Sequence, residues 1–104
     1  MAQTNRKKYR VTPRARKDLI NIGRYTERTC GKSQRNIYLK EIEARFQWLA
    51  VNPLHGKHRI DICEGYYSFP QGQHVIFYLV GDTFIDIIGL LHKEMDTINY
   101  FQKK

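Results

Sequence analysis

The sequence predicts an α+β domain in which an N-terminal strand and an antiparallel helical hairpin pack on a small, twisted, mainly antiparallel β-sheet. Three observations predict this class. Segments 13–30 and 32–51 carry apolar residues at helical spacing and are separated by one glycine. The second half of the chain has short apolar runs divided by turn residues. At 104 residues, the chain is long enough to bury one core without disulfides or metals.

The first elements are a short strand over residues 8–12 and a helix over 13–30. Thr12 offers a hydroxyl as N-cap, and Pro13 suits the first helical position because its missing N–H would have no partner there. One face of this helix is apolar and carries Ala15, Leu19, Ile22 and Thr26. Gly31 can adopt the left-handed conformation that closes a helix. The helix should therefore end at Cys30.

A second helix is predicted over residues 32–51. Its apolar face consists of Tyr38, Ile42, Phe46, Leu49 and Ala50. Asn52-Pro53 ends it, because the residue before proline is disfavoured in the α region. Since the connection between the helices is so short, they should pack as an antiparallel hairpin.

The rest of the chain is predicted to form the sheet. Strands are expected at 59–63, 66–69, 74–80 and 83–92, with turns at 70–72 and 81–82. The run VIFYLV is apolar on both faces, which is typical of a central strand. The tail after His92 is ambiguous between a coil and a short helix. The whole chain, 1–104, is interpreted as a single domain, with flexible ends at 1–8 and 97–104.

The composition limits the cellular locations and the kinds of partner that are possible. The formal net charge is +8, and residues 1–52 hold thirteen Lys/Arg against four Asp/Glu. A basic surface of this kind attracts a polyanion, such as nucleic acid, an acidic protein segment or anionic lipid. Two cysteines are too few for a disulfide framework, and neither a signal peptide nor a membrane-spanning segment is recognisable. These features predict a cytoplasmic protein with no membrane contact.

The positive charge is concentrated on one face of the first helix. This basic stripe consists of Arg14, Lys17, Arg24 and Arg28, with Asn21 between them, and it lies opposite the apolar face. Two interpretations remain open. The stripe is either a solvated helix face or a surface that binds phosphate or carboxylate groups.

The histidines of the sequence suggest two kinds of site, a metal site and a ribonuclease site. His55, His58, Cys63 and Asp61 have no spacing that matches a zinc signature, so no metal or other cofactor is predicted. A metal-free ribonuclease needs a base, an acid and cations that hold the phosphate. His74 and His92 supply imidazoles at the ends of strands, but Arg59 and Lys93 are the only nearby cations in the sequence. Ordinary strand-end histidines are the competing interpretation.

Four segments, taken in order, resemble a known family. They read ARKDLINIGRYT, GKSQRNIYLKEIEARFQWLAVNPLHGKHR, EGYYSFPQGQHVIFY and LLHKEMD. Together they resemble the ParE branch of the ParE/RelE toxin superfamily, and the similarity runs from about Tyr9 to Asp96. The most specific parts are GKSQRNIYL, NPLHGK, SFPQGQHVIFY and LLHKEMD.

The resemblance implies the same hairpin-on-sheet fold and the toxin of a type II toxin–antitoxin module. ParE members are associated with poisoning of DNA gyrase, and no catalytic apparatus is known for them. They are neutralised by an antitoxin whose C-terminal segment wraps the toxin. Operator DNA would be contacted indirectly, through the antitoxin. RelE members instead cut mRNA on the ribosome with basic residues on the sheet, and this ribonuclease activity is the alternative. A third possibility is an attenuated toxin that mainly serves in antitoxin–operator complexes.

Partner binding, and not catalysis, is therefore predicted for the candidate residues. They comprise the basic stripe and the polar edge of the sheet half, namely Arg14, Lys17, Arg24, Arg28, Arg59, Tyr66, Ser68, Gln73, His74, His92, Lys93 and Asp96.

The chain departs from the family pattern at four positions. Tyr67 and Gly89 stand where arginine is common, and Gly23 and Cys30 stand where tryptophan is common. For Gly89, two explanations compete: a neighbouring group fills the space, or a functional cation has been lost from an open face of the sheet. The second is favoured here, because Asp86 in the same strand suggests a solvent-facing edge.

Overall fold

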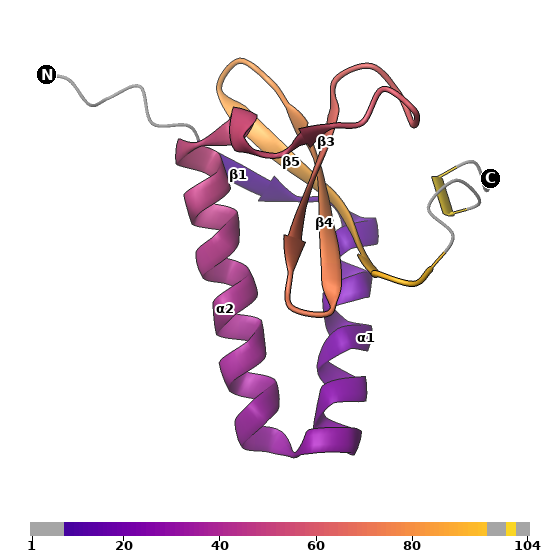
Figure 1. Cartoon of the computed structure of the whole chain (residues 1–104). Helices are drawn as coiled ribbons and strands as arrows, with labels where there is room; N and C mark the ends of the chain where they lie inside the picture. Colours follow the sequence, from indigo (N-terminus) through magenta and orange to yellow (C-terminus); the bar gives the residue numbers. More distant parts are fainter. Residues whose placement is uncertain (1–7, 96–99, 102–104) are drawn as a thin grey trace, which may run out of the picture.

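The computed structural model describes residues 8–95 and 100–101, and it places two helices against one five-stranded sheet (Figure 1). The order along the chain is β1 (Lys8–Val11), α1 (Pro13–Cys30), α2 (Lys32–Val51), the 3₁₀ turn η1 (Pro53–His55), β2 (Lys57–His58), β3 (Tyr66–Gln71), β4 (His74–Val80) and β5 (Phe84–His92). The predicted α+β class is confirmed. No helix in the described part is long and apolar enough to cross a membrane.

Both helices begin and end at the predicted residues because the local signals act as expected. The Thr12 hydroxyl accepts a hydrogen bond from the Ala15 N–H at 3.2 Å, and Pro13 occupies the first turn of α1. Gly31 has a φ of +93°, which only glycine adopts readily, and it separates the two helices. The helices run side by side and are joined at the bottom of Figure 1. The predicted helical hairpin is therefore present.

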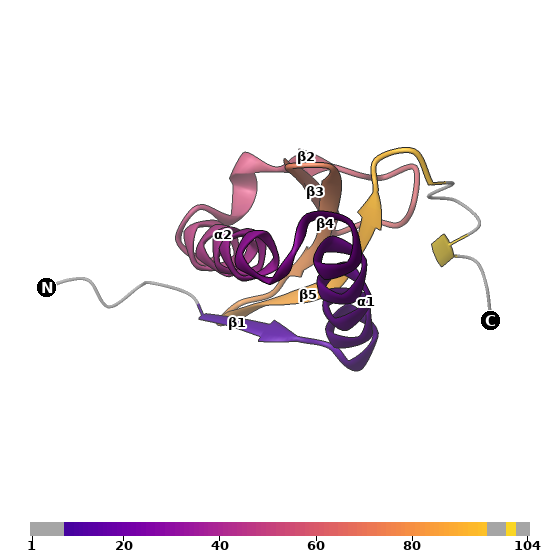
Figure 2. The ribbon, with the colours of Figure 1, turned by 90° about the horizontal axis from the view of Figure 1, so that it is seen from below.

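The sheet is mixed, with the strand order β1-β5-β4-β3-β2. All neighbouring pairs are antiparallel except β1 and β5, which are parallel. In Figure 2 the helices are seen nearly end-on, with β1 at one edge of the sheet and β2 at the other. β1 pairs with residues 84–87 only, so the second half of the nine-residue β5 extends beyond its neighbour.

A β-bulge in β5 changes which side chains face the helices. Tyr78 pairs with Ile87 and Phe77 with Gly89, so Ile88 is the extra residue. Ile85 and Ile87 face the helices before the bulge, and Leu90 joins the same core cluster after it. The bulge also places His92 opposite His74. Side chains of β5 thus alternate in one phase before Ile88 and in the opposite phase after it.

The main core lies between the helical hairpin and one face of the sheet. Its fully buried members include Ile42 and Leu49 from α2, and Ile76 and Tyr78 from β4. Tyr78 also fixes the loop after α2, since its O–H donates to the Pro53 carbonyl at 2.7 Å and its oxygen accepts from the Gly56 N–H at 3.1 Å. Burial raises the pKa of Tyr78 to about 12.

One predicted strand is wrong. Residues 59–63 form turns, in which the N–H groups of Ile62 and Cys63 both donate to the Arg59 carbonyl, and the strand preceding β3 is only Lys57–His58. The apolar residue that suggested a strand, Ile60, is 68% exposed, so no burial holds this segment against the sheet. The predicted turn at 70–72 is also misplaced, because Pro70 and Gln71 belong to β3 and the turn comprises residues 72–73.

Candidate functional site

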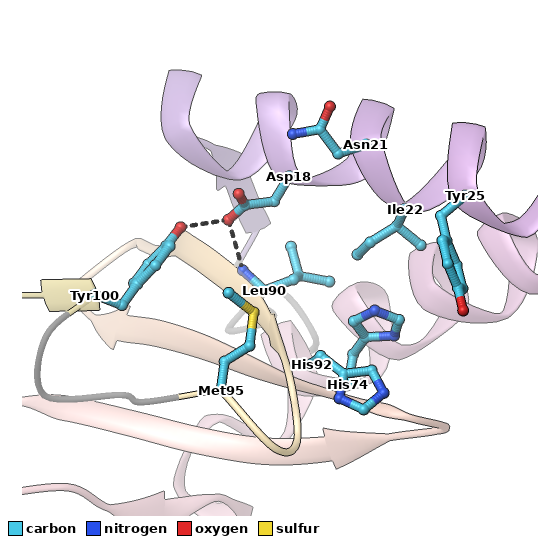
Figure 3. A pocket seen from close by; sticks show the side chains of 9 residues that line it. All are labelled: Asp18, Asn21, Ile22, Tyr25, His74, Leu90, His92, Met95 and Tyr100. Carbon is cyan, nitrogen blue, oxygen red and sulfur yellow. Dashed lines mark hydrogen bonds between the residues drawn. The ribbon is translucent and has the colours of Figure 1, made fainter.

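A groove of about 440 Å³ lies between α1 and the free end of β5 (Figure 3). It forms where β5 continues past β1, so that α1 and not another strand stands beside this edge of the sheet. Ile22 and Leu90 make its apolar floor as members of the main core. We call it the α1–β5 groove, and its lining residues are Asp18, Asn21, Ile22, Tyr25, His74, Leu90, His92, Met95 and Tyr100.

Asp18 lies at one end of the groove and binds a backbone N–H of β5 that no neighbouring strand reaches. Its Oδ2 accepts a hydrogen bond from the Leu90 N–H at 3.0 Å, which is a backbone group that β1 does not reach. The same oxygen accepts from the Tyr100 O–H at 2.5 Å (Figure 3). Burial, and then this contact with a carboxylate, raise the pKa of Tyr100 above its ordinary value. Asp18 therefore ties α1, β5 and the C-terminal part of the chain together.

Two histidines line the sheet side of the groove. His74 and His92 are cross-strand partners, with ring centroids 5.6 Å apart. The His74 Nδ1 lies 2.7 Å from the Tyr38 hydroxyl, which also donates to the Gln71 carbonyl at 3.0 Å. Burial, and then the neighbouring His92, lower the pKa of His74 below 6.5, so this ring is uncharged at neutral pH. The pair supplies polar groups to the groove without positive charge on His74.

The basic stripe borders the groove at two of its members, Arg14 and Arg28. All four of its cations are exposed, and none forms an ion pair within residues 8–95 and 100–101. The Arg14 guanidinium lies 4.5 Å from the Tyr100 ring centroid, and the Arg28 guanidinium lies 6.0 Å from that of Tyr25. These two arginines thus place free positive charge beside an apolar cavity.

Arg59 lies on the other face of the sheet, away from the helices. Asp61 accepts two hydrogen bonds from its guanidinium, at 2.9 and 2.8 Å, and the Ser68 hydroxyl accepts a third at 3.3 Å. These bonds hold the pKa of the Asp61 carboxyl below its ordinary value. Arg59 also stacks on Phe77, with 5.5 Å between its guanidinium carbon and the ring centroid. Its positive charge is therefore locally neutralised.

The structure divides the predicted site residues into separate groups. His74 and His92 meet in the groove, whereas Tyr66, Ser68 and Arg59 lie on the helix-free face, where Phe101 packs on Tyr66 and Phe77. Gln73 and Lys93 are adjacent at the sheet end, because the Lys93 N–H donates to the Gln73 carbonyl at 2.9 Å. Asp96 lies outside the described residues.

This division argues against a phosphodiester-cleaving site. The predicted acid and base candidates, His74 and His92, face the helices, and the predicted cation Arg59 is on the opposite face of the sheet. Among the described residues, no three His, Cys, Asp or Glu side chains gather as metal ligands would. What the groove offers is an apolar floor, polar walls and a basic border, which are features of a binding surface.

The favoured explanation of Gly89 is wrong. Gly89 is buried, and a Cβ at this position would lie 2.9 Å from the Tyr100 hydroxyl oxygen and 3.2 Å from the Asp18 Oδ2. Tyr100 and Asp18 therefore fill the space next to Gly89. Asp86 did not indicate an open face at Gly89, because Asp86 lies beside β1 and is bound to Arg10, whereas Gly89 lies beyond β1 and next to Tyr100.

We expect Gly89→Ala to lower the free energy of unfolding by about 1–3 kcal/mol, the usual cost of overpacking. The new methyl group would displace Tyr100 from Asp18. In a Tyr100→Ala background the same substitution should cost nothing or stabilise slightly, because alanine is preferred over glycine in a strand. Denaturant unfolding of the four proteins measures this coupling. An equal cost in both backgrounds would show that Tyr100 is not the obstacle.

Two of the other three departures are explained by packing. Tyr67 stacks between His58 and Tyr78, with ring centroids 4.8 and 5.7 Å away, so it contributes to packing. A Cβ at Gly23 would lie 3.3 Å from the Leu39 side chain, and a tryptophan would not fit against α2 here. Cys30 is exposed at the end of α1, and nothing in the structure explains its replacement of tryptophan.

Five groove residues were not predicted from the sequence: Asp18, Tyr25, Leu90, Met95 and Tyr100. A signal for the first two exists, because Arg14, Asp18, Asn21, Tyr25 and Arg28 recur at steps of four and three and form one row on α1. The row has cations at its ends and an aspartate and a tyrosine inside, which distinguishes it from a uniformly solvated face.

Comparison with known proteins shows which family the sequence resembles. A family model described as the ParE toxin of type II toxin–antitoxin systems matches residues 9–97. Toxin ParE1 of Caulobacter vibrioides is 36% identical over 90 residues, which cover 86% of this chain and 93% of the relative. Toxin ParE1 of Mycobacterium tuberculosis, strain CDC 1551 / Oshkosh, is 33% identical over 90 residues, which cover 86% of this chain and 92% of that protein.

Solved structures share the fold. A chain of the chromosomal ParDE toxin–antitoxin system from P. aeruginosa superimposes with a TM-score of 0.75 at 16% identity, covering 88% of this chain and all of the other. A chain of the toxin–antitoxin complex RelBE2 from Mycobacterium tuberculosis gives a TM-score of 0.61 at 22% identity, covering 84% and 98%. At these identities the similarity establishes the fold alone.

Proposed function

Because the chain belongs to the ParE toxin family of type II toxin–antitoxin systems, we propose that it inhibits DNA gyrase without catalysing a reaction of its own and that a cognate antitoxin neutralises it. Operator DNA would be contacted through the antitoxin. The observation that carries the proposal is the family match over residues 9–97. A cytoplasmic location follows from the proposed target and partner.

The arrangement of polar groups favours this function over mRNA cleavage. A ribonuclease would need acid, base and phosphate-binding cation around one substrate. Here the two histidines and Arg59 are on opposite faces of the sheet, and Asp61 already binds the guanidinium of Arg59. The helix-free face is partly covered by Phe101. These positions support a toxin that acts by binding.

Two assays with the purified protein test the proposal. We expect ATP-dependent supercoiling of relaxed plasmid by gyrase to stop and cleaved plasmid to accumulate, with translation in a cell-free extract unaffected. Loss of translation with cut mRNA, abolished by His74→Ala or His92→Ala, would favour the ribonuclease instead. Binding of the antitoxin without either inhibition would leave the attenuated toxin as the better description.

The polar edge and the basic stripe are the proposed antitoxin surface. The stripe is supported by its exposure and its lack of ion pairs among the described residues. For the sheet edge, His74, His92 and Lys93 lie at the open end of the groove or next to it. Tyr66, Ser68 and Arg59 would be reached only by a partner that also covers the helix-free face.

Removing the stripe charges should slow antitoxin binding. With Arg14, Lys17, Arg24 and Arg28 changed to glutamine, we expect an unchanged fold and an association rate constant roughly tenfold lower at low salt, because exposed charges steer association. The salt dependence should also weaken, since charges are screened over about 8–10 Å at ordinary ionic strength. Stopped-flow binding over a salt series measures both quantities.

The matched control removes four exposed cations elsewhere, at Arg16, Lys32, Lys40 and Lys57. It changes the net charge equally but leaves the stripe intact. If the association rate falls equally in both variants, the stripe acts only through the net charge of the protein. If the rate of the stripe variant is unchanged, the stripe is a solvated helix face without a role in binding.

A further inference from the structure

We infer that the α1–β5 groove is the anchor site for one short segment of the antitoxin, an apolar stretch with an acidic residue at each end. The inference rests on the proposed function for the identity of the partner. It adds the place of binding and the pattern of side chains along the segment.

The groove presents apolar surface that the described part of the chain leaves exposed. Tyr25 is 59% exposed and Met95 is 55% exposed, and both stand over the floor made by Ile22 and Leu90 (Figure 3). Covering such side chains is favourable by roughly 25 cal/mol per Å² of apolar surface. The volume of about 440 Å³ lies in the usual range for sites that receive organic groups, roughly 300–1,000 Å³. Apolar side chains of a partner fit this space.

Cations mark both ends of the groove wall. Arg14, Asp18, Asn21, Tyr25 and Arg28 form one row on α1, so the groove-lining members of the row lie between two arginines. Arg28 follows Arg14 by fourteen positions, a distance of about 21 Å along a helix at 1.5 Å per residue. An extended peptide covers this distance in about six residues. The charges therefore match a short segment with a carboxylate near each end.

The apolar floor and the Asp18 carboxylate both disfavour an acidic side chain inside the groove, which determines the side chains of the segment that face it. The Asp18 carboxylate is negative, and its Oδ2 already accepts hydrogen bonds from Leu90 and Tyr100. His74 is uncharged at neutral pH and offers no compensating positive charge. A partner carboxylate placed inside would be repelled and desolvated. The acidic side chains must then point to Arg14 and Arg28, and the apolar side chains to Ile22 and Leu90.

A nucleic acid fits this surface less well than a protein segment. Phosphates repeat regularly along a strand, whereas the row of cations is interrupted by Asp18 and by the apolar groove itself. Tyr25 and Met95 would remain exposed beside a phosphate backbone that contacted only the arginines. The combination of an apolar cavity with charged ends favours an amphipathic acidic peptide.

The probe is the antitoxin, taken as the product of the neighbouring gene that blocks toxicity. Its binding kinetics separate the contribution of the apolar groove from that of the two arginines. For Tyr25→Ser/Met95→Ser we expect a dissociation constant at least tenfold higher, mainly through faster dissociation, with the association rate and its salt dependence within twofold of wild type. For Arg14→Gln/Arg28→Gln we expect slower association and weaker salt dependence. Leu54→Ser/Ile60→Ser, two exposed apolar positions outside the groove, is the matched control and should change nothing beyond twofold.

The outcomes distinguish this inference from the proposed function. A dissociation constant within twofold of wild type for the groove variant, with the fold verified by thermal melting, would overturn the groove as anchor. Weaker antitoxin binding by the groove variant, together with no gyrase inhibition by the free wild-type protein, would sustain the groove and overturn the proposed target. If a 20-base-pair DNA duplex binds, and only Arg14→Gln/Arg28→Gln weakens the binding of the duplex or of the antitoxin, the row of residues on α1 binds nucleic acid and the inference is wrong. If the wild-type protein does not bind the antitoxin, both the proposed partner and the proposed role of the groove are wrong.

Discussion

Replacing Phe46 by alanine is expected to lower the free energy of unfolding by about 3–5 kcal/mol. Phe46 is 2% exposed and belongs to the core between α2 and the sheet, where its ring centroid lies 5.4 Å from that of Tyr9 in β1. Truncation would remove the contacts of the ring and leave a cavity that the surrounding helix and strand cannot fill. The loss is a large part of the roughly 5–15 kcal/mol by which proteins of this size are stable.

Urea unfolding of wild type and Phe46→Ala gives the difference directly. Two controls calibrate it. Phe46→Leu keeps most of the volume and should cost about 1.5 kcal/mol or less. Ile37→Ala, on the same helix but at a half-exposed position, should change stability by no more than about 0.5 kcal/mol. A loss below about 1 kcal/mol for Phe46→Ala would mean that the ring does not fill the interface.

The second large effect is expected at Gly56, where alanine should cost about 3 kcal/mol, the upper end of the usual overpacking range. A Cβ there would overlap the Tyr78 hydroxyl oxygen and lie 2.7 Å from the Ser68 carbonyl. Because the Tyr78 hydroxyl bonds both the Gly56 N–H and the Pro53 carbonyl, its displacement would also break the link between this loop and the core. The melting temperature should fall by roughly 12–24 °C.

A double-mutant cycle with Tyr78→Phe identifies the cause. Tyr78→Phe alone should cost about 1–3 kcal/mol, since the Pro53 carbonyl and the Gly56 N–H lose their partner. It also removes the atom with which an alanine at position 56 would collide most closely. The double variant should therefore be clearly more stable than the sum of the single losses predicts. Strict additivity would show that the Ser68 carbonyl, and not the phenol, limits the space at Gly56.

The helices could be predicted from the sequence because their signals are local. Thr12-Pro13, Gly31 and Asn52-Pro53 act through hydrogen bonds and backbone angles within a few residues, and the helix bounds follow from them. The segment 59–63 was misread because an alternating pattern has no meaning without a partner strand. Its charged members Arg59 and Asp61 bind one another across two positions, which a turn permits.

The groove could not be predicted because it depends on contacts between distant parts of the chain. Asp18 meets Leu90 and Tyr100 only after α1 has packed beside β5. The histidine pair shows a second reason. An uninterrupted β4–β5 register starting from Val80 and Ile85 would place His74 opposite Leu91, and the bulge moves it opposite His92. Hydrophobic pattern alone does not reveal a bulge whose extra residue, Ile88, is itself apolar.

The bulge at Ile88 lets this strand change its length by one residue in evolution without changing which side chains face the groove. With Ile88 deleted, Ile87 would still pair with Tyr78 and Gly89 with Phe77, so His92 would stay opposite His74 in a regular ladder. Losing the bulge while keeping all nine residues of β5 would instead bring Leu91 opposite His74 and turn His92 away from α1. Related toxins that align with a one-residue gap at this position should therefore keep the same sheet-side wall of the groove.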